Sequence, residues 1–159
     1  MKFGIRLIEF LGPSRELLRL AVAAESAGVD SIWFPHDLFM RNTWALTSAV
    51  AMLTHRVRLG SVGINVHTNH PAEIATYAAT LDELSGGRCI LGLGMHTADM
   101  VQWTGIDTTD HLKRMREAVD VIRRLLRGEA ASSPGPAFRW NDQCYLRFQP
   151  ARPDIPIYT

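Results

Sequence analysis

The segment at residues 81–94, with the sequence LDELSGGRCILGLG, constrains the fold of this chain more than any other. It predicts the end of a helix, a stop at Gly86 and Gly87, a tight turn, and a buried strand that ends at Gly94. That strand is apolar along its length, which is typical of a parallel strand covered on both faces. Ligands collect at the carboxyl ends of such strands, so the residues after Gly94 are candidates for a site.

The rest of the chain repeats this alternation of strand and helix. We expect strands at residues 2–8, 31–34, 57–63, 88–94 and 155–158, and helices at residues 14–27, 44–53, 71–84 and 112–126. The last helix is the clearest, because its apolar residues share one stripe: Leu112, Met115, Val119, Ile122 and Leu126. A Pro/Gly/Ser-rich loop follows, and then a hairpin at residues 138–148, so a small β-hairpin insertion is predicted over about residues 129–150.

Repeated strand–helix units of this length predict a parallel sheet, either open and doubly wound or closed into a (β/α)8 barrel. An open dinucleotide-binding sheet carries Gly-x-Gly-x-x-Gly after its first strand. The only near match begins at Gly92, follows the fourth strand, and has Thr97 in place of the third glycine. A full barrel needs about 250 residues. As a barrel, residues 1–159 would therefore be the N-terminal portion of a single domain, an incomplete (β/α)8 TIM barrel of class α/β with strands 1–5 parallel.

The composition excludes several classes of protein. The net charge is +1, with 47% hydrophobic and 21% charged residues, and no block of Lys or Arg indicates a nucleic-acid or membrane-surface partner. No run of about 18 apolar residues predicts a transmembrane helix, and the N-terminus lacks the apolar core of a signal peptide. The two cysteines form no disulfide framework, and Cys89 is expected to be a buried structural thiol. We expect a cytoplasmic protein.

Two polar clusters follow predicted strands. His36 and Asp37 come after the second strand, and a histidine beside a carboxylate can titrate near neutrality and move protons. In the alternative interpretation, His36 only caps the strand end through a hydrogen bond. After the fourth strand, backbone N–H groups of the segment 94–97 can bind phosphate or ring carbonyl oxygens.

Further histidines raise the question of a metal. His67 and His70 form a His-x-x-His pair in a loop, and His36 and His96 could lie near the same barrel mouth. The chain has no Glu partner at the spacing of zinc enzymes, so we predict no metal site.

Five motifs in this order carry a family resemblance: WFPHD at 33–37, LGSVGIN at 59–65, HPAE at 70–73, LDELSGGR at 81–88 and LGLG at 91–94. Together they resemble the N-terminal half of the bacterial luciferase-like monooxygenase superfamily. The nearest branch is that of the coenzyme F420-dependent methylenetetrahydromethanopterin reductase-like proteins. The resemblance covers nearly the whole chain and implies the barrel rather than the open sheet.

The resemblance also implies an activity. It predicts an oxidoreductase that transfers hydride between coenzyme F420 and a small-molecule organic substrate. Two alternatives stay open: an FMN-dependent monooxygenase on the same barrel, and a non-catalytic truncated or split-barrel chain that needs a partner. A homodimer or a complementing half-barrel is the expected assembly.

Site residues follow from the same resemblance. It implies catalytic roles for His36 and Asp37, although the family usually has the order Asp-His. Cofactor contacts are implied at these positions: His36, Val62, Gly63, Asn65, Gly94, Met95, His96 and Thr97.

The resemblance further implies a bulge and a non-prolyl cis peptide at Val62–Gly63. The alternative there is an ordinary strand end with a turn glycine, and Asn65 is likewise a common turn residue. Arg6 and Thr97 stand where the reductases carry acidic residues, so neither the reductase mechanism nor its pterin substrate is expected to carry over.

Overall fold

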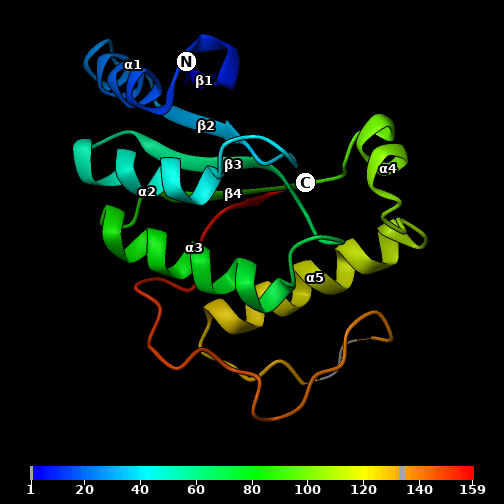
Figure 1. Ribbon diagram of the computed structural model, residues 1–159. Coiled ribbons are helices and arrows are strands. Elements are labelled where there is room, and N and C mark those ends of the chain that lie inside the picture. Colours follow the sequence, from blue (N-terminus) through cyan, green and yellow to red (C-terminus); the bar gives the residue numbers. More distant parts are fainter. Residues whose placement is uncertain (1, 133–134) are drawn as a thin grey trace.

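Five parallel strands pair in the order in which they occur in the chain, β1-β2-β3-β4-β5 (Figure 1). The computed structural model describes residues 2–132 and 135–159. Its strands are β1 (Gly4–Arg6), β2 (Ser31–Pro35), β3 (Arg58–Asn65), β4 (Cys89–Gly94) and β5 (Ile157–Tyr158). Its helices are α1 (Ser14–Ser26), α2 (Thr43–Leu53), α3 (Pro71–Ser85), α4 (Ala98–Thr104) and α5 (His111–Leu126), with the 3-10 turn η1 at Glu9–Leu11.

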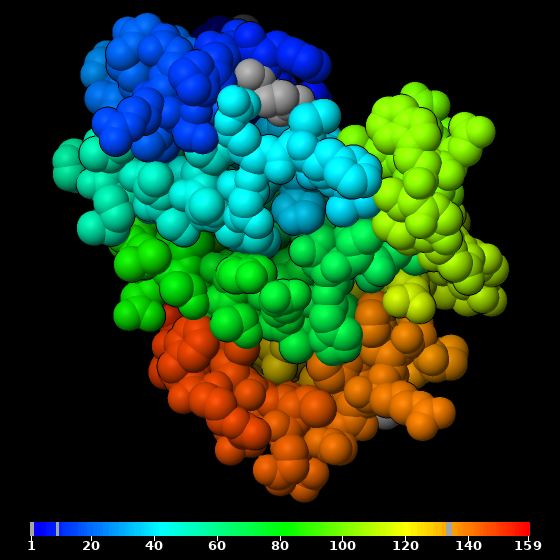
Figure 2. All heavy atoms as spheres, viewed as in Figure 1, coloured from blue at the N-terminus to red at the C-terminus, as the bar shows by residue number. Residues whose placement is uncertain are grey.

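The helices between strands cover one face of the sheet. The four longer helices contact one another in order, α1 with α2, α2 with α3, and α3 with α5. The colour bands of Figure 2 accordingly cross the molecule in chain order, and α4 protrudes at one side. An unbroken strand order with all crossover helices on one face is the arrangement of a barrel wall, which confirms the prediction of an incomplete barrel. Within the described residues, no helix has the length and apolar character needed to span a membrane.

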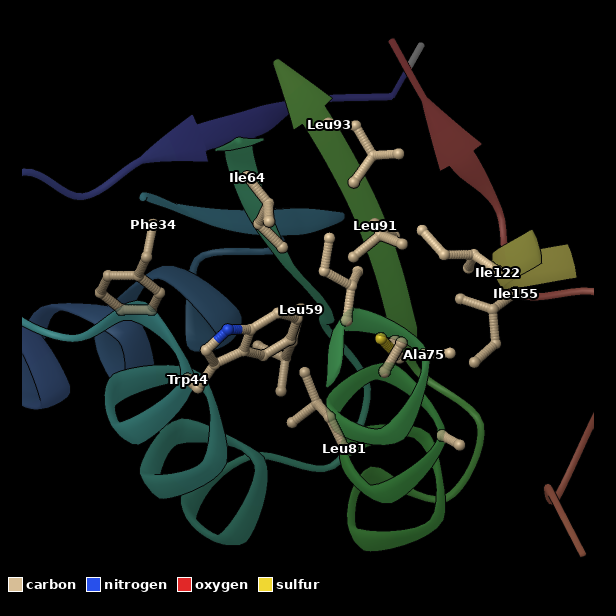
Figure 3. Close-up of a cluster of buried hydrophobic side chains, with 14 of the residues drawn as sticks. Phe34, Trp44, Leu59, Ile64, Ala75, Leu81, Leu91, Leu93, Ile122 and Ile155 are labelled. Carbon is tan, nitrogen blue, oxygen red and sulfur yellow. The ribbon is translucent and has the colours of Figure 1, made fainter. Parts of the chain in front are cut away.

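The hydrophobic core lies between the sheet and these helices. Phe34, Leu59 and Leu91 project from three neighbouring strands and are fully buried. Figure 3 shows Phe34 on the side of the cluster near Trp44, and Leu91 on the side near Ile122 of α5. The sequences of β2 and β4 are nearly continuous apolar runs because these strands are also largely buried on the opposite face of the sheet.

On that opposite face, one indole lies across strands that carry glycine. A Cβ atom added at Gly60 would lie 2.8 Å from Cε3 of Trp33, and one added at Gly92 would lie 3.4 Å from Cζ3. The Trp33 ring meets Tyr158 of β5 edge-on, with 5.7 Å between ring centroids. Beside these rings a hollow of about 440 Å³ opens between β1 and β5. At Gly60 the Trp33 ring and Ile90 leave no room for a side chain, and at Gly92 the carbonyl oxygen of Ser61, 2.5 Å from an added Cβ, excludes one.

At the amino end of the sheet, Arg88 joins α2, α3 and β3. Its guanidinium donates to the carbonyls of Ala51 and Thr54 at the end of α2, and to that of Val57 before β3, at 2.8–2.9 Å. It also donates to the Thr54 hydroxyl and to the Ser85 carbonyl. Carbonyls at a helix end have no partner within the helix, so one side chain supplies donors that the backbone lacks.

Asp82 forms a second connection at the same end. Its carboxylate is fully buried, accepts the backbone N–H of Cys89 at 3.0 Å, and forms a bidentate ion pair with Arg152. Gly86 and Gly87 between these residues have φ of 67° and 85°, the left-handed region that favours glycine. Burial raises the pKa of the Cys89 thiol to about 12, in keeping with the structural thiol expected there.

The predicted hairpin at residues 138–148 is wrong, because this part of the described chain contains turns and bends but no strand. The buried carboxylate of Glu117 accepts the backbone N–H groups of Ala137 and Phe138, each at 2.9 Å. Phe138 and Trp140 pack against the ring of His70 and do not lie on paired strands of a hairpin. Phe138 and Trp140, whose apolar character led to the hairpin prediction, therefore hold a loop against α5 and the start of α3.

We predict that Arg88→Lys destabilises the chain by about 1–3 kcal/mol, because lysine keeps the charge but cannot reach all these carbonyls. Urea unfolding measures the difference. Arg15→Lys on α1, at an exposed position, is the matched control and should stay within about 0.5 kcal/mol of the native chain. Equal effects at the two positions would contradict a structural role for Arg88.

Candidate active site

The predicted site residues gather at the carboxyl ends of β2, β3 and β4. His36 and Asp37 directly follow β2, Val62 to Asn65 close β3, and Gly94 closes β4. Parallel pairing brings these ends to one edge, with Pro35 opposite Val62 and Asn65 opposite Gly94. The fold thus brings together residues that are up to about 60 positions apart in the sequence.

A β-bulge interrupts β3 at this edge. Ser61 pairs with Leu91 and Ile64 pairs with Leu93, so Val62 and Gly63 together face the single residue Gly92. The predicted bulge is confirmed. The predicted cis peptide at Val62–Gly63 is wrong, since the described chain has no cis peptide bond. Gly63 instead adopts a φ of 84°, and its left-handed conformation absorbs the extra residue with a trans bond.

The two glycines of the predicted cofactor site touch each other. A Cβ added at Gly94 would lie 2.8 Å from the Cα of Gly63, so the β3 and β4 backbones approach too closely for any side chain at Gly94. Packing alone therefore requires glycine here. The same packing leaves a strand edge without side chains beside the exposed Val62.

Four buried polar atoms at this edge have no hydrogen-bond partner among the described residues. They are Nδ1 of His36, Oγ of Ser61, Nδ2 of Asn65 and Nδ1 of His96. Buried polar groups in native proteins almost always have a partner. Polar groups left over at the carboxyl ends of neighbouring parallel strands are typical of a binding or catalytic site.

His36 is held in place by its backbone rather than by its ring. Its backbone N–H donates to the carbonyl of Val62 at 3.1 Å, which extends the pairing of β2 with β3 by one residue. Burial lowers the pKa of His36, the neighbouring charge of Asp37 opposes this, and His96 adds to the lowering. The imidazole is therefore neutral at pH 7, and its Nδ1 remains available to a ligand.

His96 lies beneath the same edge, with only 6% of its surface exposed. Its Nε2 lies 3.1 Å from Oγ1 of Thr68, a residue of the loop after β3. Burial lowers the pKa of His96, and the charge of Asp37 raises it. The shared influence of Asp37 on His36 and His96 shows that the ends of β2 and β4 belong to one electrostatic environment.

Two of the predicted contact residues, Met95 and Thr97, add no unpartnered polar atom to this edge. Thr97 is the N-cap of α4, and its hydroxyl accepts the N–H of Met100 at 3.4 Å. Met95 is 57% exposed and borders a hollow of about 660 Å³ between β4, β5 and α5, away from His36. This hollow is the larger one, but its lining lacks the four unpartnered atoms, so we assign the site to the strand edge.

A smaller hollow of about 260 Å³ opens directly on His36 and Asp37. Its other polar walls include Asn42 and Thr43 from the start of α2 and Thr68 and Asn69 from the loop after β3. Thr68 and Asn69 were missed from the sequence, because a polar loop gives no sign of which side chains turn toward the site. Their position just after the end of β3 was the one sequence feature that could have identified them as site residues.

The loop histidines do not converge. His67 bonds to His111 of α5, with 3.0 Å between Nε2 and Nδ1, and His70 packs on Phe138 and Trp140. Among the described residues, no group of three or more His, Cys, Asp or Glu side chains is placed to hold a metal ion.

Comparisons with known proteins agree on the family. The family model of luciferase-like monooxygenases matches residues 1–159. A 5,10-methylenetetrahydromethanopterin reductase from Archaeoglobus fulgidus is 35% identical over 158 residues, which cover 99% of this chain and 46% of that protein.

Solved structures share the fold. The coenzyme F420-dependent tetrahydromethanopterin reductase from Methanopyrus kandleri matches with a TM-score of 0.88 and 24% identity, over 98% of this chain and 49% of its own. The oxygenating constituent of 3,6-diketocamphane monooxygenase from Pseudomonas putida, in complex with FMN, matches with a TM-score of 0.74 and 22% identity, over 92% and 44% of the two chains. The chain spans about half the length of the curated relatives it matches.

We predict that Asp37→Asn lowers the pKa values of His36 and His96, because the Asp37 charge raises both. NMR titration of the imidazole Cε1–H signals measures this directly. Asp142→Asn, in an exposed turn on the far loop, is the control and should leave both titrations unchanged. Identical titration curves for the Asp37→Asn and native chains would contradict the shared environment.

Proposed function

Because the chain belongs to the luciferase-like monooxygenase family, we propose that it carries the active-site half of an oxidoreductase that transfers hydride between coenzyme F420 and a small organic substrate. One observation carries this proposal: four buried polar atoms that have no partner within residues 2–132 and 135–159 lie around the bulge at the ends of β2, β3 and β4. The similarity in sequence to a methylenetetrahydromethanopterin reductase along 99% of the chain, and in fold to a coenzyme F420-dependent tetrahydromethanopterin reductase, supports coenzyme F420 as the cofactor.

The residues at the edge fit a planar ring that bears carbonyl oxygens. Gly63 and Gly94 leave the strand edge flat, and Val62 is exposed beside them. The Asn65 amide is oriented, because its Oδ1 accepts the N–H of His67 at 2.7 Å, and this leaves Nδ2 as a donor without a partner. We therefore propose that Val62, Gly63 and Gly94 support the ring and that Asn65 donates to one of its oxygens.

Coenzyme F420, when bound, supplies the hydride chemistry, and the protein orients it and manages protons. Burial lowers the pKa of His36, which favours the neutral imidazole that can accept a proton. Asp37 stabilises the protonated form of His36 through its charge. Among the predicted residues that line the hollow of about 260 Å³, these two have the chemistry for proton transfer.

We further propose that a complementing half-barrel completes the working enzyme, from a second chain or from further strands. β1 and β5 are the two edges of the sheet, and an edge strand presents unpaired backbone groups. Between them lies the hollow of about 440 Å³, where Tyr158 is 50% exposed. The remaining strands of a barrel would pair with both edges and fill this hollow with inward side chains.

An FMN-dependent monooxygenase is the second candidate. The match in fold to a monooxygenase solved in complex with FMN supports this candidate. The flat glycine edge and the Asn65 donor suit either ring, because both present carbonyl oxygens on a planar system.

Fluorescence titrations with coenzyme F420 and with FMN test the proposal, on this chain and on a version extended through the remaining strands. We expect tighter binding of coenzyme F420. Tighter binding of FMN would favour the monooxygenase instead. Binding by neither version would contradict both candidates and favour a non-catalytic chain.

Asn65→Asp makes this test specific to the site. Aspartate keeps the oxygen that accepts from His67 but replaces the Nδ2 donor, so the dissociation constant of the cofactor should rise about 10-fold or more. Asn141→Asp is the matched control, since Asn141 also accepts a backbone N–H two residues ahead, in a loop away from the strand edge. Equal affinities in both variants would remove Asn65 from the site.

A further inference from the structure

Thr68 connects the hollow beside His36 to a buried histidine. Its side chain is exposed and lines this hollow together with His36 and Asp37. The Oγ1 atom lies 3.1 Å from Nε2 of His96, which itself does not reach the hollow. A ligand in the hollow therefore meets His96 only through the Thr68 hydroxyl.

The hydrogen-bond network assigns the proton of this hydroxyl. The carbonyl of Asn65 already accepts two donors of Asn69, the backbone N–H at 3.0 Å and Nδ2 at 3.1 Å. The Thr68 oxygen is 3.5 Å from that carbonyl, which is longer than an ordinary O–H···O bond. Nε2 of His96, at 3.1 Å, is the nearer acceptor, and it accepts from the Thr68 hydroxyl when the imidazole carries its proton on Nδ1.

A Thr68 hydroxyl that donates to His96 determines which nitrogen of His96 carries the proton and which lone pairs of Thr68 stay available. Neutral imidazole has one N–H and one acceptor nitrogen, so a Nε2 that accepts from Thr68 leaves the proton on Nδ1. The Thr68 oxygen has two lone pairs, and Nδ2 of Asn69 donates to one of them at 3.1 Å. The second lone pair can accept a hydrogen bond from a hydroxyl group in the hollow.

We propose that Thr68 is a catalytic residue whose hydroxyl relays a proton between a hydroxyl-bearing substrate and His96; this inference rests on the proposed oxidoreductase function. The substrate O–H bond breaks and its proton adds to Oγ1 of Thr68. At the same time the Oγ1–H bond breaks and that proton adds to Nε2 of His96. The substrate oxygen keeps the electron pair, and the reverse transfer returns a proton to it.

The surroundings of His96 suit a group that gains and loses a proton. Its burial favours the neutral imidazole, and the Asp37 charge favours the imidazolium that the relay forms. His36 lies on the same hollow and interacts with His96 through charge, so the two histidines would not both be protonated at once. His96 acts through Thr68 and is therefore a positioning residue.

Long-range ¹H–¹⁵N NMR spectra of His96 test the assignment in the native chain, in Thr68→Ser and in Thr68→Val. We expect the Nδ1–H tautomer in the native chain and in Thr68→Ser, which keeps the hydroxyl. Thr68→Val has the same shape without the donor and should shift the population to the Nε2–H tautomer. A native Nε2–H tautomer, or no change in Thr68→Val, would overturn the proposal.

Titration with 2-propanol in the same spectra tests the relay. The Nε2 signal of His96 should move in the native chain and in Thr68→Ser, and should lose this response in Thr68→Val. An equal response in all three chains, or none in the native chain, would overturn the relay. Neither NMR measurement needs a cofactor. Failure to bind coenzyme F420 or FMN would therefore count against the proposed function, while the NMR spectra alone decide the hydrogen bond between Thr68 and His96.

Discussion

The hydrogen bonds of Arg88 at the amino end of the sheet set the geometry on which the site depends. They tie the end of α2 and the start of β3 to the turn that precedes β4. From this point β3 and β4 pair in regular register, Leu59 with Cys89 and Gly60 with Ile90. The irregularity appears only after Ser61, so the bulge is confined to the end where the candidate site lies. Regular pairing of β3 with β4 at the amino end therefore accompanies a bulge at the carboxyl end.

Buried polar groups have hydrogen-bond partners at the amino end of the sheet, whereas several at the carboxyl end have none among the described residues. At the amino end, the buried carboxylate of Asp82 has Arg152 and the N–H of Cys89 as partners. At the carboxyl end, Asn65 and His96 are also buried, and each keeps one polar atom without a partner in the described part of the chain. Satisfied groups stabilise a fold, whereas a buried polar group without a partner needs an explanation such as a bound water, an ion or a catalytic role. This contrast is why we place the chemistry at the carboxyl end.

Much of the fold could be predicted from sequence, because helical periodicity and apolar strands report directly on burial. The LDELSGGR motif at residues 81–88 identified the family, and its residues prove to be structural contacts around Asp82 and Arg88. The hairpin prediction failed because Phe138 and Trp140 pack on a helix, which an alternating pattern cannot distinguish from a strand. Thr68 was missed because its role arises from a contact with His96, 28 residues away. The catalytic roles of His36 and Asp37 stay predictions.

The order β1-β2-β3-β4-β5 bears on how the chain assembles. Every strand pairs with a neighbour in sequence, so each new strand needs only the segment made just before it. Domains fold as the chain emerges from the ribosome, and contacts between nearby segments form fastest. The order of strands in this wall therefore matches the order of their synthesis, so the edge with which each strand pairs is made before that strand. The edge at β5 is then the point from which assembly of a closed barrel would continue.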